Sequence, residues 1–147
     1  MNRRDFIHTS CLTCAASVGL LSFLQSCTTN KYVSNFKVDQ KKLSVKRAEF
    51  TVVKKGKTIQ QKFILLKPEN SPFPIALYQL PNDQFKALYL ECSHQGCELN
   101  PYETALVCPC HGAEFNTKGE VTQGPAEASL KTFVTSSDAE NVYIQLA

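Results

Sequence analysis

The sequence lacks three features that would point to other kinds of protein. It has no internal repeat and no low-complexity run, which excludes a repeat array or a disordered chain. Outside the first 30 residues, no window of eleven or more residues shows a helical period, so a helical bundle is not expected. The basic stretch from Lys31 to Lys67 lacks an interleaved aromatic platform, and nucleic-acid binding is therefore not expected. A chain of 147 residues has room for one domain.

Cations are scarce in the second half of the chain. From Pro68 to Ala147 there are three Lys and ten Asp or Glu, whereas from Lys31 to Lys67 eleven Lys or Arg stand against two acidic residues. One interpretation is a pair of solvated faces of opposite charge. The other is orientation, with basic residues toward an anionic membrane and an acidic face toward a basic partner protein.

The N-terminus resembles an export signal. "MNRRDFI" places two arginines before a Phe, as in twin-arginine signals, and no Asp, Glu, Lys or Arg occurs from Phe6 to Asn30. The twin-arginine route carries folded proteins, so it is used by domains that must fold before they cross the membrane.

The apolar core of this signal ends in "LQSC", which resembles a lipoprotein cleavage box and would make Cys27 the lipidated first residue of the mature chain. The alternative is an uncleaved anchor, although the core is near the lower limit of about 17–25 residues for a membrane span. We favour a signal over residues 1–27, a tether over 28–40 and one domain over 41–147. Both alternatives predict an exported, membrane-anchored protein on the periplasmic or extracytoplasmic side.

Beyond the signal the chain predicts β-strands. Short runs rich in β-branched and aromatic residues alternate with turn-forming segments such as "KKGK", "LPND" and "TKGE". The runs are "EFTVV", "TIQQKFILL", "FPIALYQL", "FKALYLEC", "TALVC", "LKTFVTS" and "NVYIQLA". The sequence therefore predicts an all-β, antiparallel domain of about 110 residues.

Four cysteines and two histidines gather in "CSHQGC", residues 92–97, and "CPCHGAEF", residues 108–115. The other cysteines and the third histidine all lie in the first 27 residues, so this concentration indicates a site. Zinc would accept two thiolates and two imidazoles. Zinc leaves Cys97 and Cys110 unexplained, and two spare thiols close together in an exported protein would oxidise.

The two boxes resemble those of the Rieske iron–sulfur family, in the subgroup with a disulfide, and "GPA" at 124–126 is similar to its proline loop. The resemblance covers Leu80 to Ala147. It implies an antiparallel β-sandwich with cluster-binding loops at one end and one [2Fe–2S] cluster. It also implies two pairs of iron ligands and a disulfide: Cys92 and Cys108 on one iron, His94 and His111 on the other, and a Cys97–Cys110 bond. Imidazole ligation raises the potential relative to all-cysteine clusters.

Neighbouring residues depart from the quinol-oxidising members of that family, which carry Ser and Tyr at positions 113 and 115 and Leu at position 95. Here these are Ala113, Phe115 and Gln95. The hydroxyls normally donate to cluster sulfurs. If each bond contributes about 1–2 kcal/mol, its loss lowers the potential by roughly 40–90 mV. We therefore expect a low to middle Rieske potential. Gly112, Gly124 and Pro125 complete the expected surroundings of the cluster.

Three functions are compatible with the sequence, and the first two follow from the resemblance. The first is a membrane-tethered carrier of single electrons between redox partners, a cytochrome or an oxidoreductase; "HGAEF" and "GEVTQGPA" are similar to soluble Rieske ferredoxins. The second is a subunit of a quinol-oxidising cytochrome bc-like complex or of a periplasmic oxidase. A zinc-binding structural lipoprotein is third. No further histidine follows His111, so a mononuclear iron site for oxygenation is excluded.

Overall fold

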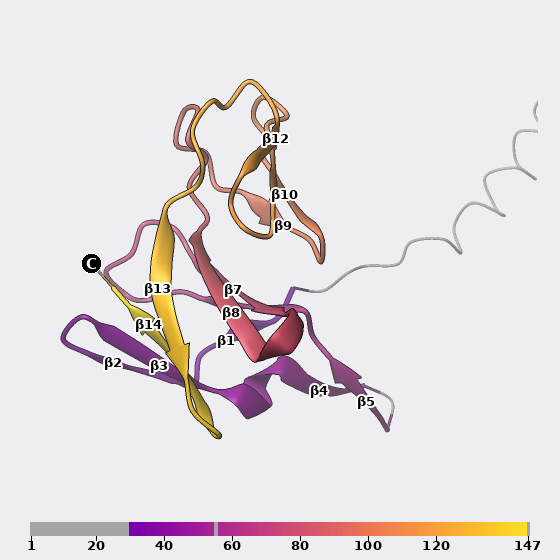
Figure 1. Ribbon diagram of the computed structural model, residues 1–147, viewed down its shortest axis with the longest axis vertical. Helices are drawn as coiled ribbons and strands as arrows, with labels where there is room; N and C mark the ends of the chain where they lie inside the picture. Colours follow the sequence, from indigo (N-terminus) through magenta and orange to yellow (C-terminus); the bar gives the residue numbers. More distant parts are fainter. Residues whose placement is uncertain (1–29, 55, 147) are drawn as a thin grey trace, which may run out of the picture.

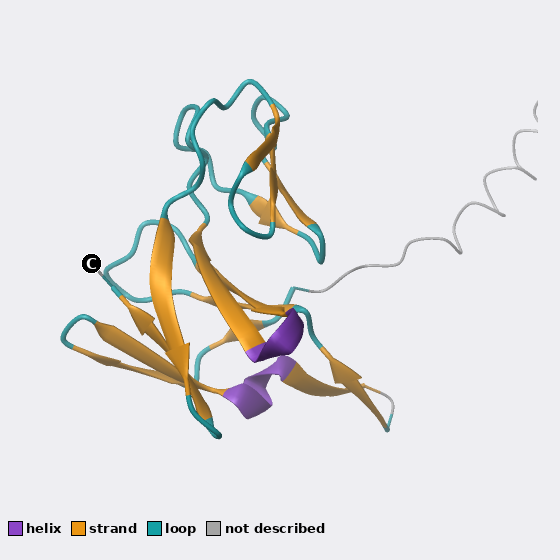
Figure 2. Ribbon diagram, viewed as in Figure 1, coloured by secondary structure: helices purple, strands orange, loops and turns teal. Residues whose placement is uncertain are grey.

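The computed structural model describes residues 30–54 and 56–146, which are built almost entirely of strands (Figure 2). Two short 3-10 segments interrupt them, η1 (Arg47–Phe50) and η2 (Pro81–Asp83). The strands are β1 (Tyr32–Val33), β2 (Phe36–Asp39), β3 (Lys42–Lys46), β4 (Thr51–Lys54), β5 (Lys57–Gln60), β6 (Phe63–Leu66), β7 (Ile75–Leu80), β8 (Gln84–Tyr89), β9 (Asn100–Pro101), β10 (Ala105–Val107), β11 (Glu114–Asn116), β12 (Val121–Gln123), β13 (Thr132–Ser137) and β14 (Asn141–Gln145).

The strands form one large sheet, one small sheet and a hairpin. The large sheet has the order β1-β6-β7-β8-β13-β14-β3-β2, the small sheet the order β12-β11-β10-β9, and β4 pairs with β5. Neighbouring strands are antiparallel except for the two-residue pair of β1 with β6. The all-β prediction is confirmed. Within the described residues no helix is long and apolar enough to span a bilayer.

The molecule divides into two lobes (Figure 1). The small lobe, residues 90–130, holds the small sheet and three long loops at one end of the molecule. The large lobe, residues 30–89 and 131–146, holds the large sheet and the β4–β5 hairpin. The chain enters the small lobe from β8 and returns through β13, and these two strands are neighbours in the large sheet.

The central strands β6, β7 and β8 are buried on both faces. Because successive side chains of a strand point to opposite faces, alternate residues enter two different hydrophobic cores. The first core joins the lobes and contains Phe63, Leu65, Ala76, Tyr78 and Leu88 together with Leu90, Cys92, Leu99, Leu106, Cys108, Ala113, Phe115, Ala126 and Leu130. The second lies within the large lobe and includes Ile64, Leu66, Ile75, Leu77 and Ala87 against β3 and β14. This double burial explains the uninterrupted apolar run "FILL".

The structure differs from the sequence prediction near the N-terminus. Strands β1 and β2 lie inside residues 28–40, which the sequence assigned to a tether, and β1 pairs with β6 of the central layer. Lys31 also forms an ion pair with Glu49 (2.9 Å). The sequence did not predict β2 because the charged residues of "FKVD" obscure the alternation of apolar and polar side chains. This strand is exposed at the edge of the sheet.

The predicted strand "TIQQKFILL" is split into two. Its first part, β5, forms the exposed hairpin with β4, and its second part, β6, enters the central layer. Gln61 is hydrogen-bonded through its backbone N–H to the carbonyl of Phe50 (2.7 Å) between the two parts.

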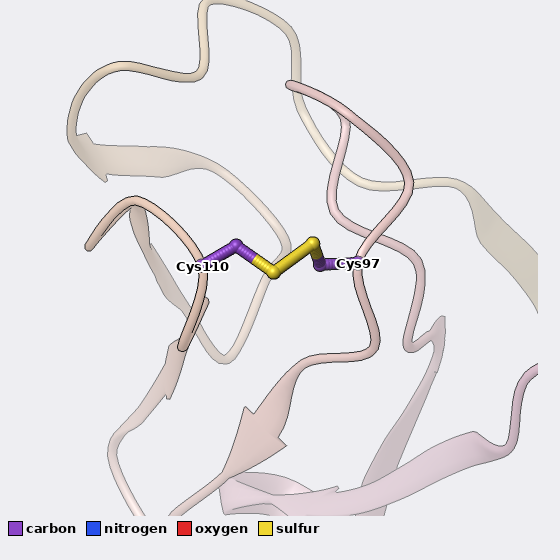
Figure 3. The surroundings of a disulfide bond; sticks show 2 residues. All are labelled: Cys97 and Cys110. Atoms are coloured by element: carbon purple, nitrogen blue, oxygen red, sulfur yellow. A yellow bond between two sulfur atoms is a disulfide. The ribbon is translucent and has the colours of Figure 1, made fainter.

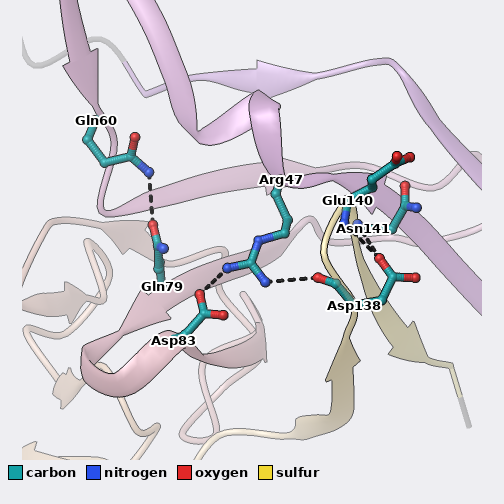
Figure 4. Close-up of polar contacts among 7 residues, drawn as sticks. All are labelled: Arg47, Gln60, Gln79, Asp83, Asp138, Glu140 and Asn141. Carbon is teal, nitrogen blue, oxygen red and sulfur yellow. Dashed lines mark hydrogen bonds and ion pairs between the residues drawn. The ribbon is translucent and has the colours of Figure 1, made fainter.

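Polar contacts hold the end of the large lobe that lies away from the loops (Figure 4). Arg47 of η1 pairs with Asp83 of η2 and donates to the carbonyl of Asp138 (3.0 Å) in the β13–β14 turn. Nearby, Gln60 donates to the side chain of Gln79 (2.9 Å). One arginine therefore links three connecting segments that are distant in sequence.

A buried tyrosine links the two lobes. Tyr78 is 1% exposed in the first core, and its hydroxyl donates to the carbonyl of Tyr102 (2.8 Å) in the β9–β10 turn. Burial raises the pKa of Tyr78 well above its ordinary value of 10.0. The folded state therefore favours the neutral phenol, and the stability that this provides is complete below pH 10 and is lost as the pH rises from there toward the folded pKa.

We predict that Tyr78→Phe lowers the free energy of unfolding by about 1–3 kcal/mol, because the Tyr102 carbonyl loses its buried donor. The variant should also lose part of the alkaline destabilisation above pH 10. Urea unfolding of the variant and the parent between pH 7 and pH 11 measures both effects. Tyr102→Phe is the control, since that ring is 48% exposed. Equal stability of parent and Tyr78→Phe at pH 7 would contradict the proposed link.

Candidate metal centre

The two motif loops have the same backbone hydrogen bonds. In each, the N–H of the first cysteine donates to the carbonyl five residues on, and the N–H four residues on donates to the carbonyl of that cysteine. The four bonds are Cys92 N to Cys97 O (2.8 Å), Gly96 N to Cys92 O (2.9 Å), Cys108 N to Ala113 O (2.8 Å) and Gly112 N to Cys108 O (3.0 Å). The two boxes are therefore two copies of one turn, although their side chains differ.

Glycine at the fifth position permits this turn. Gly96 has φ +69° and Gly112 has φ +73°, in the left-handed region that side chains with a Cβ rarely adopt. At Gly112 an added Cβ would meet no atom within 4 Å, so the backbone conformation alone favours glycine there. The repeated pattern Cys-x-x-x-Gly is visible in the sequence and marks both positions; Gly112 was among the predicted site residues and Gly96 was not.

A disulfide joins the two loops (Figure 3). It links Cys97 to Cys110, with a Cα–Cα distance of 6.6 Å. The bond closes a loop of 13 residues, which by chain-entropy arguments stabilises the fold by about 3 kcal/mol. The structure thus contains the disulfide that the resemblance implied, and the bond fixes the distance between the loops.

The other two motif cysteines are buried thiols in contact. Cys92 and Cys108 are each 2% exposed. Burial raises the pKa of Cys92. Burial opposes ionisation of Cys108 as well, but the backbone N–H of Cys110, a hydrogen bond from the Cys92 thiol and the backbone N–H of His111 outweigh it and lower the pKa of Cys108. Both loops therefore direct backbone donors at a sulfur, an arrangement that stabilises a thiolate.

The two motif histidines are exposed and adjacent. The ring centroids of His94 and His111 lie 5.0 Å apart, and the rings meet edge to face at 88°. Each histidine comes from a different loop, so the disulfide also determines this pairing. The site has a buried thiol side and a solvent-facing imidazole side.

The end of β12 and the loop that follows it, residues 124–131 (the third loop), are bonded to the two motif loops. Ser93 donates through its hydroxyl to the carbonyl of Ala128 (2.6 Å), and Gln123 donates through its side-chain amide to the carbonyl of Gly112 (3.1 Å). The third loop contains the cis peptide bond Gly124–Pro125. Sequence reasoning missed Ser93 and Gln123, and local sequence holds no signal for them because their partners are 35 and 11 residues away.

The remaining expected neighbours divide by burial. Ala113 and Phe115 are fully buried in the first core, whereas Gln95, Gly112, Gly124 and Pro125 are exposed. Gln95 also contributes its backbone N–H to the surroundings of the Cys92 sulfur. Cys27, the expected lipidation site, lies outside the described residues.

The donor set fits an iron–sulfur cluster better than a site of cysteines alone. The sulfurs of Cys97, Cys108 and Cys110 lie within 4.8 Å of one another, yet two of them are joined in the disulfide and cannot bind as thiolates. That proximity places the disulfide directly beside the thiol side of the site. Two free thiols near backbone donors and two paired imidazoles remain, and thiolates and imidazoles are the ligand types that a Rieske cluster uses.

An all-β domain that presents two thiols and two imidazoles from disulfide-linked loops belongs to the class of mixed cysteine–histidine metal proteins. A family model described as the Rieske [2Fe-2S] domain matches residues 30–134. The chain therefore belongs to the Rieske [2Fe-2S] family, whose members carry one [2Fe–2S] cluster.

Iron-sulfur subunits of cytochrome b6-f complexes are similar to this chain over short stretches. The cytochrome b6-f complex iron-sulfur subunit of Prochlorococcus marinus (strain MIT 9303) is 38% identical over 55 residues, 36% of this chain and 31% of that protein. The chloroplastic subunit of Oryza sativa subsp. japonica is 46% identical over 41 residues, 26% of this chain and 18% of that protein. The matches thus span less than a third of these relatives.

A solved structure is similar over more of its length. It is the crystal structure of the cyanobacterial plasma membrane Rieske protein PetC3 from Synechocystis PCC 6803, with a TM-score of 0.50 and 33% sequence identity. The similarity covers 57% of this chain and 86% of that chain. The likeness supports the Rieske β-sandwich with its loops at one end.

We predict that Phe115→Tyr raises the reduction potential by roughly 40–90 mV, because the added hydroxyl can donate to a cluster sulfur and stabilise the reduced state. Ala113→Ser is expected to act in the same direction. Protein-film voltammetry of the variants measures the shift. Phe133→Tyr, in β13 of the large lobe, is the control and should leave the potential unchanged. Unaltered potentials in both loop variants, or a parent potential near +300 mV, would contradict the argument.

Proposed function

We propose that this protein is an exported, membrane-tethered electron carrier that passes single electrons between redox proteins. We assign Cys92 and Cys108 as ligands of one iron and His94 and His111 as ligands of the other. When bound, a [2Fe–2S] cluster supplies a one-electron couple. The single observation that carries the proposal is the exposed imidazole pair on two disulfide-linked loops whose free thiols are buried.

The protein's own residues supply three conditions for such a carrier. The first core excludes water from the thiol side, since Cys92 and Cys108 are packed among apolar side chains. The disulfide and the bonds of Ser93 and Gln123 hold the three loops together, which limits rearrangement on gain or loss of an electron. The exposed histidines give a partner close access to the metal site.

The names of the relatives favour a second candidate, an iron–sulfur subunit of a quinol-oxidising complex. Two features argue against it. Gln95 places an exposed polar amide beside the histidine pair, where quinol-oxidising members carry Leu, and only thirteen residues separate His94 from Cys108. Reduction of the protein by a quinol in isolated membranes, lost with a cytochrome bc inhibitor, would support this candidate over the carrier.

The ligand assignment predicts the spectrum of the reduced protein. Low-temperature electron paramagnetic resonance should give an average g value below 2, as expected for mixed cysteine and histidine ligation of one iron pair. Metal analysis should give two irons per chain and no zinc. His94→Ala should abolish the signal, whereas Gln95→Ala, at the neighbouring exposed position, should retain it. A silent spectrum with stoichiometric zinc would contradict the proposed function.

The membrane tether predicts a phenotype at Cys27. If Cys27 is lipidated, Cys27→Ala should release the folded domain from washed membranes into the soluble fraction. Cys14→Ala, within the same N-terminal segment, is the matched control and should leave the distribution unchanged. Immunoblots of the two fractions measure the result. Continued membrane attachment of Cys27→Ala would favour an uncleaved anchor instead.

A further inference from the structure

The charges of the protein are separated between its two lobes. The large lobe, residues 30–89 and 131–146, contains thirteen Lys or Arg and six Asp or Glu, whereas the small lobe, residues 90–130, contains six Glu and one cation, Lys118. The small lobe stands at one end of the molecule (Figure 1). The protein is therefore a dipole whose negative end carries the candidate metal centre.

Three exposed carboxylates lie in the segments that form this centre. Glu91 directly precedes the first motif loop, Glu98 directly follows it, and Glu127 lies in the third loop. Ser93 bonds to Ala128, which brings the third loop against the first. We call Glu91, Glu98 and Glu127 the acidic collar.

Nothing described in the structure neutralises the collar. Glu91 and Glu98 are direct partners in an antiparallel bridge, an arrangement in which like charges repel. The ion pairs among residues 30–54 and 56–146 are Lys31–Glu49 and Arg47–Asp83, both within the large lobe. The fold thus places two like charges opposite each other directly beside the proposed ligands. Locally unfavourable arrangements of this kind are concentrated at functional sites.

We infer that the acidic collar is the docking surface for a redox protein whose own electron-transfer site is surrounded by Lys and Arg. The inference rests on the proposed function, because electrons must pass near the exposed pair His94 and His111. A cationic partner gains attraction and orientation at this end of the dipole, and an anionic partner is repelled there. Because exposed charges act mainly on association, the collar selects the partner through the rate of encounter.

The test uses the full-length reduced protein and a cytochrome c with a strongly basic surface. The probe is compared with the same cytochrome after succinylation, which converts its lysines to carboxylates. One electron passes from the reduced protein to the haem iron(III), which becomes iron(II), and stopped-flow absorbance follows this change. At low ionic strength the native cytochrome should react roughly tenfold faster or more. In 1 M salt, where the Debye length is about 3 Å, the two rates should converge.

Two triple variants with the same change in net charge separate the collar from the rest of the surface. Glu91→Gln/Glu98→Gln/Glu127→Gln should slow the native cytochrome several-fold at low ionic strength. Glu69→Gln/Glu103→Gln/Glu140→Gln, which neutralises three other exposed carboxylates, should slow it much less. The spectrum and potential of each variant are measured first, so that a change at the cluster is not mistaken for a change in docking.

The outcomes separate the inference from the proposed function. Equal losses in the two triple variants, or no preference for the native cytochrome, overturn the docking surface while leaving the protein an electron carrier. A protein that cannot be reduced and shows no cluster spectrum overturns the proposed function and the docking surface with it. A collar-specific loss together with the preference for the native cytochrome supports the inference.

Discussion

The burial of two free thiols in the core that joins the lobes is the constraint on which the rest of the structure depends. Cys92 and Cys108 are packed with residues of both lobes, including Phe63 and Tyr78 of the central strands. A buried thiolate is costly unless donors surround it. The two motif loops direct backbone N–H groups at both sulfurs, which offset part of the cost of burial at Cys92 and outweigh it at Cys108, and glycine permits the left-handed turn in each loop. The position of the site is therefore determined by the packing of the whole protein.

The two copies of one turn also explain the asymmetry of the site. Each turn begins with a buried cysteine, but the third residue is His94 in one loop and Cys110 in the other, and the sixth is Cys97 in one and Ala113 in the other. The same backbone thus presents a histidine or a disulfide cysteine at equivalent positions. The disulfide joins non-equivalent positions of the two turns, and the histidines meet on the exposed side. Two copies of one turn that carry different side chains therefore produce a site with buried thiols and solvent-exposed imidazoles.

The sequence was most informative where residue type alone limits the structure. The apolar runs predicted β7, β8, β13 and β14, and the resemblance of the two Cys and His boxes to a known family implied the two loops and the disulfide between them. Strands of two or three residues, such as β9 and β12, are too short for a periodic signal. Strand β2 lies at a sheet edge with exposed and partly charged side chains, and β1 pairs with β6, a strand distant in sequence. For the same reason the bonds of Ser93 and Gln123 are not visible in local sequence.

At some positions of the site a substitution changes both the stability of the fold and the reduction potential, whereas at others it changes neither the core nor its packing. Ala113 and Phe115 are fully buried, so a hydroxyl added at either must find an acceptor or remain unsatisfied at a cost of about 1–3 kcal/mol. The sequence can alter the potential there only by also altering the packing of the core. Gln95, Glu91 and Glu98 are exposed, and changes at these positions affect what approaches the histidines with little effect on the core. The surface around the histidines can therefore be changed separately from the core around Cys92 and Cys108.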